Sequence, residues 1–102
     1  MSVTLAYDPG HLGLRFANQN FSITIGRFPD GSPAEVFIDL AKSGQDLQSI
    51  VRDAGVALSL ALQHGVPIAT IRRAITRDGN GAPASILGAV VDRLPATPRG
   101  AA

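Results

Sequence analysis

Residues 34–65 read AEVFIDLAKSGQDLQSIVRDAGVALSLALQHG, and the spacing of their apolar side chains changes partway through. Within 36–40, Val, Ile and Leu fall on one face two residues apart, which is the period of a half-buried strand. From Gly44 the interval becomes three or four residues, which is the period of a helix. The apolar positions of this helix are Leu47, Ile50, Val51, Ala54, Ala57, Leu58, Ala61 and Leu62. We expect it to end at His64, because Gly65 is a natural C-terminal stop.

Two further strands are expected before this stretch. Residues 12–16 and 21–25 each carry large apolar side chains at alternate positions, and a polar break at 18–20 separates them. Asparagine tolerates the left-handed backbone of a tight turn, so the break predicts a hairpin. The sequence PDGSP at 29–33 predicts a second turn, because proline fixes φ and glycine is permissive. Together these signals predict three antiparallel strands in meander order.

Two shorter helices are expected after the long one. Pro67 suits the first turn of a helix whose apolar side chains include Ile68, Ile71 and Ile75. Residues 86–94 repeat the helical spacing, and the proline at 95 stops them. The fold class predicted is α+β, with a three-stranded antiparallel sheet packed against one long helix and two shorter C-terminal helices. A single domain would span residues 11–94, between an N-terminal extension at 1–10 and a disordered tail at 95–102.

Composition limits the functions that this chain can have. Its 102 residues are 45% hydrophobic and 17% charged, which is the balance of one globular domain. The formal net charge of +1 gives no overall attraction to nucleic acid or acidic membranes. The absence of cysteine excludes disulfides, thiolate metal sites and thiyl-radical chemistry within the chain. Since no signal peptide or membrane-spanning run is apparent, we expect a soluble cytoplasmic protein.

Several of these motifs occur in a familiar order. They are the strand AEVFI at 34–38, the turn AKSG at 41–44, the run SLALQHGVPI at 59–68 and the late helix SILGAVVDRL at 85–94. This order resembles the TSCPD domain, the small C-terminal module of vitamin B12-dependent (adenosylcobalamin, class II) ribonucleotide reductases. The resemblance covers about residues 14–94, and the chain looks like a copy of the module that stands alone as a short protein.

The resemblance implies a connection with deoxyribonucleotide metabolism. In the family the module follows a catalytic barrel that binds adenosylcobalamin and holds the radical cysteines. This chain has only the module, and residues 53–59 read DAGVALS where the family has its cysteine-containing signature. We therefore expect a non-catalytic accessory, regulatory or assembly domain that needs no cofactor. It would not be an enzyme on its own, although the family is one of ribonucleoside-diphosphate reductases.

Protein contacts are the expected mode of action, with a ribonucleotide reductase subunit as the partner that the resemblance implies. Glu35, Phe37 and Asp39 fall on the strand face opposite the predicted core, where an exposed aromatic side chain suggests a contact point. Val56 and Leu60 add a second apolar stripe to the long helix. A helix that is apolar on two sides needs cover on both, which predicts a homo-oligomer.

The alternative function is that of a nucleotide- or nucleic-acid-binding regulator. Arg72, Arg73 and Arg77 form the most concentrated charge of the chain, and guanidinium groups bind phosphate through paired hydrogen bonds. On a helix, Arg73 and Arg77 would lie one turn apart. Basic side chains near a helix C-terminus also have a purely structural explanation, because they interact favourably with the helix dipole.

The remaining polar residues do not form a recognisable catalytic or metal site. His11 and Asp8 are close in sequence, but two side chains beside flexible glycines are a poor metal set. His64 has a structural explanation at the C-terminus of the long helix. Since no residues combine a nucleophile, a base and a stabilising group, we predict no catalytic residues and no bound metal.

Overall fold

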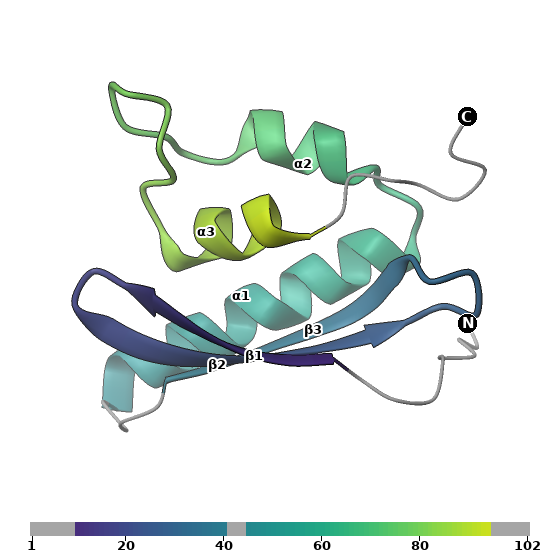
Figure 1. Ribbon diagram of the computed structural model, residues 1–102, viewed down its shortest axis with the longest axis horizontal. Helices are drawn as coiled ribbons and strands as arrows, with labels where there is room; N and C mark the ends of the chain where they lie inside the picture. The colour runs from purple at the N-terminus through teal and green to yellow at the C-terminus, as the bar shows by residue number, and fades with distance from the viewer. Residues whose placement is uncertain (1–9, 41–44, 95–102) are drawn as a thin grey trace.

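The computed structural model describes residues 10–40 and 45–94 of the chain (Figure 1). The elements in chain order are β1 (Gly10–Phe16), β2 (Gln19–Arg27), β3 (Pro33–Leu40), α1 (Gln45–Gln63), α2 (Ile68–Ala74) and α3 (Ile86–Arg93). This order confirms the predicted α+β fold. Gly10, expected in the N-terminal extension, is the first residue of β1. The rest of that extension, the turn at 41–44 and the predicted tail at 95–102 lie outside the described residues.

The three strands form the predicted antiparallel meander, in the order β1-β2-β3. Ala17 and Asn18 join the first two strands with φ angles of 51° and 64°. Positive φ at both positions is the mark of a type I′ turn, whose twist suits a hairpin. This turn begins one residue before the predicted polar break. The second turn is closed by the Phe28 amide, which donates to the Ser32 carbonyl at 2.8 Å.

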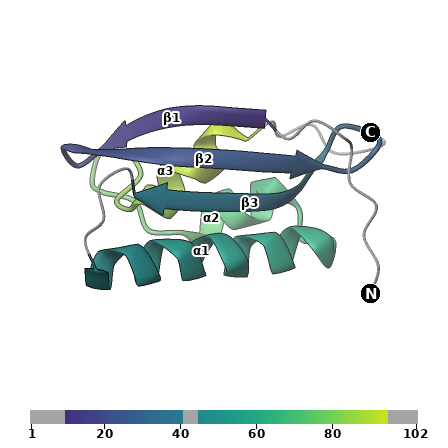
Figure 2. The same ribbon diagram turned by 90° about the horizontal axis from the view of Figure 1, so that it is seen from below.

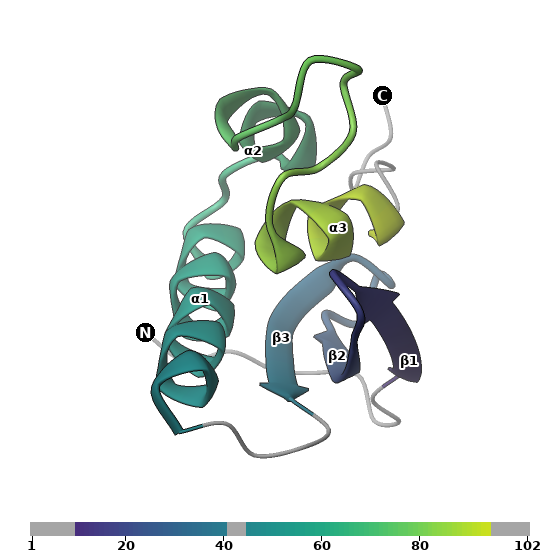
Figure 3. The same cartoon turned by 90° about the vertical axis from the view of Figure 1, so that its left-hand side faces the viewer.

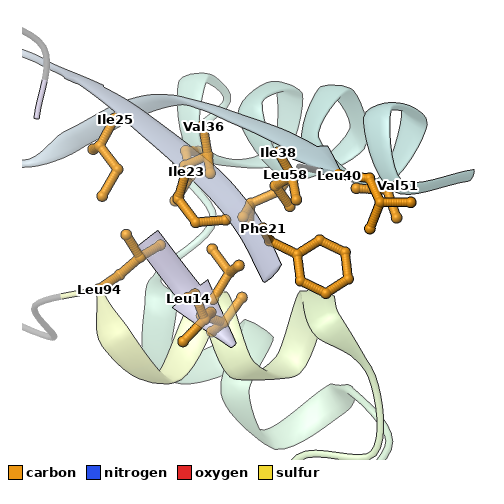
Figure 4. Close-up of a cluster of buried hydrophobic side chains, with 13 residues drawn as sticks. Leu14, Phe21, Ile23, Ile25, Val36, Ile38, Leu40, Val51, Leu58 and Leu94 are labelled. Atoms are coloured by element: carbon orange, nitrogen blue, oxygen red, sulfur yellow. The ribbon is translucent and has the colours of Figure 1, made fainter. Parts of the chain in front are cut away.

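The sheet has one apolar and one polar face. Because side chains alternate along each strand, the register places Phe21 between Leu14 and Leu40 on the inner face. The opposite, outer face carries mainly polar side chains. The core lies on the inner face (Figure 4) and contains Leu14, Phe21, Ile23, Ile25, Val36, Ile38, Leu40, Val51, Leu58, Leu62, Val90, Val91 and Leu94.

Helix α1 runs alongside β3, in the place where a fourth strand would lie (Figure 2). From this position it turns Val51, Leu58 and Leu62 toward the core beneath the inner face. Gly65, with φ of 85°, follows the helix as the sequence predicts. None of the helices in the described part of the chain is both long and apolar enough to cross a membrane.

Helices α2 and α3 complete the domain on the inner side of the sheet (Figure 3). Helix α3 lies directly over the inner face and buries Val90 and Val91, whereas α2 lies farther out and buries no side chain completely. The Ser85 hydroxyl accepts the Gly88 amide at 3.2 Å and so caps the start of α3. Leu94 has extended backbone at its end, next to the predicted proline stop.

The loop after α2 begins earlier than the sequence predicts. Ile75 already has extended backbone, with φ of −82° and ψ of 159°. The prediction that Arg77 lies on this helix, one turn from Arg73, is therefore wrong. The Asp78 carboxylate explains the loop, because it accepts the amides of Asn80 at 2.8 Å and Ala82 at 3.1 Å and holds a tight turn.

Candidate functional site

The free edge of β3 is closed by polar side chains of α1. The Gln48 side chain accepts the Leu40 amide at 2.9 Å. One turn before the end of the helix, the Ser59 hydroxyl accepts the Val36 amide at 2.8 Å and donates to the Val36 carbonyl at 3.1 Å. An exposed strand edge can pair with other chains, so these bonds remove that possibility at β3.

Two more residues of α1 complete this closure. Gln63 donates to the Ala34 carbonyl at 3.1 Å, at the other end of the strand from Gln48. Gly55 lets the two backbones approach closely, because a Cβ there would lie 2.9 Å from the Val36 carbonyl oxygen. The segment of α1 that contains Gly55 and Ser59 therefore packs against the edge of a strand.

The outer face of the sheet bears the predicted contact residues. The register sets Phe37 beside Thr24, which in turn lies beside His11, and the Phe37 side chain is 49% exposed. Glu35 and Asp39 flank this aromatic ring on the same face and are partly exposed. The structure thus places all three predicted residues of the strand together, as alternation requires.

Helix α1 extends this outer face beyond the sheet. Arg52 Nε lies 3.8 Å from Asp39 Oδ1, which identifies the side of the helix that faces outward. Residues four apart lie on the same side of a helix, so Val56 and Leu60 continue the line that begins at Arg52. Their side chains are 54% and 52% exposed. We call Glu35, Phe37, Asp39, Val56 and Leu60 together the outer surface.

The outer surface joins two sets of residues that the sequence predicted separately. Val56 and Leu60 were expected to support self-association, and the strand residues to form a different contact. Their common side follows from the position of α1 at the sheet edge. Ile50, 66% exposed, does not lie on the line of Arg52, Val56 and Leu60, although its spacing grouped it with the core positions.

Two of the three predicted arginines are engaged inside the domain. Arg77 makes paired hydrogen bonds to both carboxylate oxygens of Asp92, at 2.7 and 2.8 Å. Arg72 donates to the carbonyls of Val91 and Leu94 at the end of α3. These bonds tie α2 and its following loop to the C-terminus of α3. Sequence reasoning missed Asp92, because 15 residues separate it from Arg77.

The pair of Arg77 and Asp92 is partly shielded from solvent, with side chains 26% and 33% exposed. The hydrogen bonds from Arg77 hold the pKa of Asp92 below its ordinary value. The same bonds raise the pKa of Arg77. Charge-assisted, bidentate bonds of this kind are strong and directional, so the pair orients the loop relative to α3.

Arg73 differs from its two neighbours. It is exposed, and its guanidinium has no hydrogen bond or ion pair with any residue that the structure describes. A phosphate contact at the arginine set therefore remains a prediction that depends mainly on Arg73.

Each of the two histidines has a local contact within the fold. His64 Nδ1 lies 2.8 Å from the Leu60 carbonyl oxygen at the end of α1, where a helix terminus was expected. His11 Nδ1 lies 3.5 Å from Thr24 Oγ1 on the outer face. Asp8, considered with His11 as a metal pair, lies outside the described residues.

Comparison with known proteins relates this chain to a family of reductase modules. The TSCPD domain family matches residues 7–96. The vitamin B12-dependent ribonucleotide reductase of Rhodopirellula baltica is 45% identical over 49 residues, which are 48% of this chain and 5% of that protein. Its counterpart from Bradyrhizobium diazoefficiens is 44% identical over 43 residues, 42% of this chain and 3% of the relative.

A third relative shows the same pattern. The vitamin B12-dependent ribonucleotide reductase of Agrobacterium fabrum is 39% identical over 51 residues, which are 50% of this chain and 4% of that protein. The matches therefore span only a small part of each of these reductases. No solved structure matches the chain. Since the family match covers most of the chain and the fold is the expected one, the chain belongs to the TSCPD domain family.

Proposed function

We propose that this chain is a non-catalytic accessory or assembly module that acts through protein contacts on a vitamin B12-dependent ribonucleotide reductase in the cytoplasm. The observation that carries this proposal is the outer surface, where three large apolar side chains are about half exposed: Phe37, Val56 and Leu60. Large exposed apolar patches framed by polar residues are typical of interaction sites.

The composition of the outer surface supports a protein partner. An aromatic side chain with two aliphatic neighbours can form the apolar centre of an interface, and Glu35, Asp39 and Arg52 supply a charged rim. The ion pair of Asp39 with Arg52 is exposed and adds little stability to the domain itself. These charged groups are therefore available for specificity toward a partner.

The choice of partner rests on the relatives. They are named vitamin B12-dependent ribonucleotide reductases, and the matching segment is a small part of each. A module without cysteine has no side chain that can form a thiyl radical. We therefore propose that it acts on a reductase and does not itself carry out ribonucleotide reduction. Positioning or assembling reductase chains is the function that fits these facts best.

A direct binding measurement tests this proposal. Purified chain would be immobilised, and the affinity for the purified vitamin B12-dependent reductase of the same organism would be measured by interferometry. We expect Phe37→Ser and Leu60→Ser each to weaken binding about tenfold or more, since central apolar contacts dominate interfaces. Ile50→Ser is the matched control, because Ile50 is also a large, exposed aliphatic residue of α1 but does not lie on the line of Arg52, Val56 and Leu60. Equal affinities for all four proteins would refute the outer surface as the contact.

The alternative, a nucleotide- or nucleic-acid-binding regulator, has one specific observation in its favour. The guanidinium of Arg73 makes no hydrogen bond or ion pair with the residues at 10–40 and 45–94. Arg73→Ala tests it cleanly, whereas changes at Arg72 or Arg77 would also disturb the contacts with α3. Binding of nucleoside triphosphates and single-stranded DNA would be measured by fluorescence anisotropy at low and high salt. Loss of salt-sensitive binding in Arg73→Ala, but not in Arg93→Ala, would support this function.

A further inference from the structure

The two edges of the sheet differ in whether other residues bond to their backbone groups. Side chains of α1 occupy the backbone groups of β3, through Gln48, Ser59 and Gln63. No residue that the structure describes pairs with the opposite edge, along β1. His11, Gly13 and Arg15 are all exposed on that strand. Among the described residues, therefore, one edge of the sheet is covered and the other is not.

The hairpin determines which backbone groups β1 presents. Its two-residue turn makes Phe16 and Gln19 the pair that exchanges both hydrogen bonds. Hydrogen-bonded pairs alternate with unbonded ones along an antiparallel ladder, so every second residue before Phe16 also faces β2. The N–H and C=O groups of His11, Gly13 and Arg15 consequently point away from the sheet. Six backbone groups in a row thus face outward.

We propose that these groups pair with β1 of a second copy of this chain, in an antiparallel arrangement with a two-fold axis at Gly13. Gly13 then faces Gly13 of the second copy, and His11 faces Arg15 of the second copy on both sides of the axis. Every two-fold register of this strand sets outward-facing residues opposite outward-facing residues. The register centred on Gly13 is the one that pairs all three outward-facing residues of each copy with one another.

The apolar side chains of β1 favour this register. Leu12 and Phe16 are only partly buried by the chain's own core, on the inner face of the sheet. In the paired sheet Leu12 would lie across from Leu14 of the second copy, and Phe16 across from Gly10, which has no side chain. Cross-strand pairs of large apolar side chains stabilise sheets, and a glycine leaves room for an aromatic ring.

A second copy fits this edge better than an unlimited series of copies. β1 contains no proline, lysine or bulge, and these are the usual features that prevent edge pairing. After pairing, both ends of the six-stranded sheet would be β3 strands covered by α1. The assembly is therefore closed at two copies, whereas a sheet with two open edges would continue to grow.

Light scattering and cysteine cross-linking together test the proposal. We expect the wild-type chain at micromolar concentration to have twice its mass of 10.6 kDa. Gly13→Pro should be monomeric, because it removes an outward N–H without breaking a bond to β2, and proline is tolerated at such edge positions. Gly13→Ala should remain dimeric, since a Cβ at this position meets nothing within 4 Å.

The cross-linking experiment still tests the proposal if Gly13→Pro fails to fold. The natural chain has no cysteine, so a single introduced thiol reports only its own symmetry contact. In the proposed register Gly13→Cys places two thiols on opposed residues with Cα atoms about 5.5 Å apart, within disulfide range. Arg15→Cys is the control. In the proposed register Arg15 faces His11 of the second copy, so a cysteine at position 15 lies four residues along the strand from the equivalent cysteine of the second copy.

Mild oxidation should therefore give a covalent dimer with Gly13→Cys and little with Arg15→Cys. A monomeric wild-type chain would overturn the proposal. Equal cross-linking of both cysteine variants would also overturn it, as would a dimer that persists in Gly13→Pro but dissociates when Val56 and Leu60 become serine. That last result would assign the contact between copies to the outer surface.

Discussion

Gly55 is the residue at which helix and strand come closest. Glycine within a helix ordinarily costs about 1 kcal/mol relative to alanine, so a Gly→Ala change on a free helix would stabilise it. Here an added Cβ would lie 2.9 Å from the Val36 carbonyl oxygen and 3.3 Å from the Ile38 amide nitrogen. Both neighbours are backbone atoms, which cannot move aside without shifting β3.

We therefore expect Gly55→Ala to reduce the free energy of unfolding by about 1–3 kcal/mol, the usual cost of overpacking. Urea titration followed by circular dichroism measures the change. Gly79→Ala is the control, since a Cβ at that position meets nothing within 4 Å. A Gly55→Ala protein as stable as the wild type would mean that α1 can move away from β3 at little cost.

Asp92 makes the stability of this domain depend on pH in the acidic range. Because the hydrogen bonds from Arg77 lower the pKa of Asp92 in the folded protein, the folded state binds its proton less readily than the unfolded state does. The resulting stabilisation is present above the ordinary carboxyl pKa of about 4 and is lost as the pH falls through the lower, folded pKa.

Asp92→Asn should therefore be less stable than the wild type at neutral pH, and the difference should shrink at about pH 3. Urea unfolding at both pH values measures it. Asp53→Asn provides the comparison, because Asp53 is an exposed carboxylate on α1 without a partner among the described residues. If the loss in Asp92→Asn were the same at both pH values, the pair with Arg77 would not be responsible.

At the scale of the element, local spacing was enough to predict most of what the structure shows. Alternation gave the strands and the outward position of Phe37, and the helical period gave α1 together with the exposed pair Val56 and Leu60. Both depend on neighbours within a few residues. Turn residues fixed the two hairpin connections to within one position.

The features that the sequence did not predict depend on distant partners. Helix α1 lies beside β3 because Ser59 bonds to Val36, 23 residues earlier, and no periodicity encodes that distance. Helix α2 is shorter than predicted, and Arg77 in its following loop bonds to Asp92, 15 residues later. The composition of the outer surface could be predicted from the sequence, but its formation as one surface could not.

At the scale of the whole molecule, the question is whether the outer surface contributes to folding. The core is complete without it, since Leu58 and Leu62 on the core-facing side of α1 are 4% and 7% exposed, whereas Leu60 between them is 52% exposed. Apolar side chains that remain in water in the folded state gain little from folding. Their removal should therefore leave stability almost unchanged.

Replacing both Val56 and Leu60 by serine should change the free energy of unfolding by no more than about 0.5 kcal/mol for each site, apart from a small loss of helix propensity. Leu58→Ala, which lies between these two positions on the core-facing side of the helix, should cost about 2–5 kcal/mol because it leaves a cavity in the core. Thermal and urea unfolding of the three proteins measure this contrast. A double serine variant as unstable as Leu58→Ala would show that the chain itself covers the outer surface, whereas a stable variant that no longer binds a reductase would show that these side chains serve the partner and not the fold.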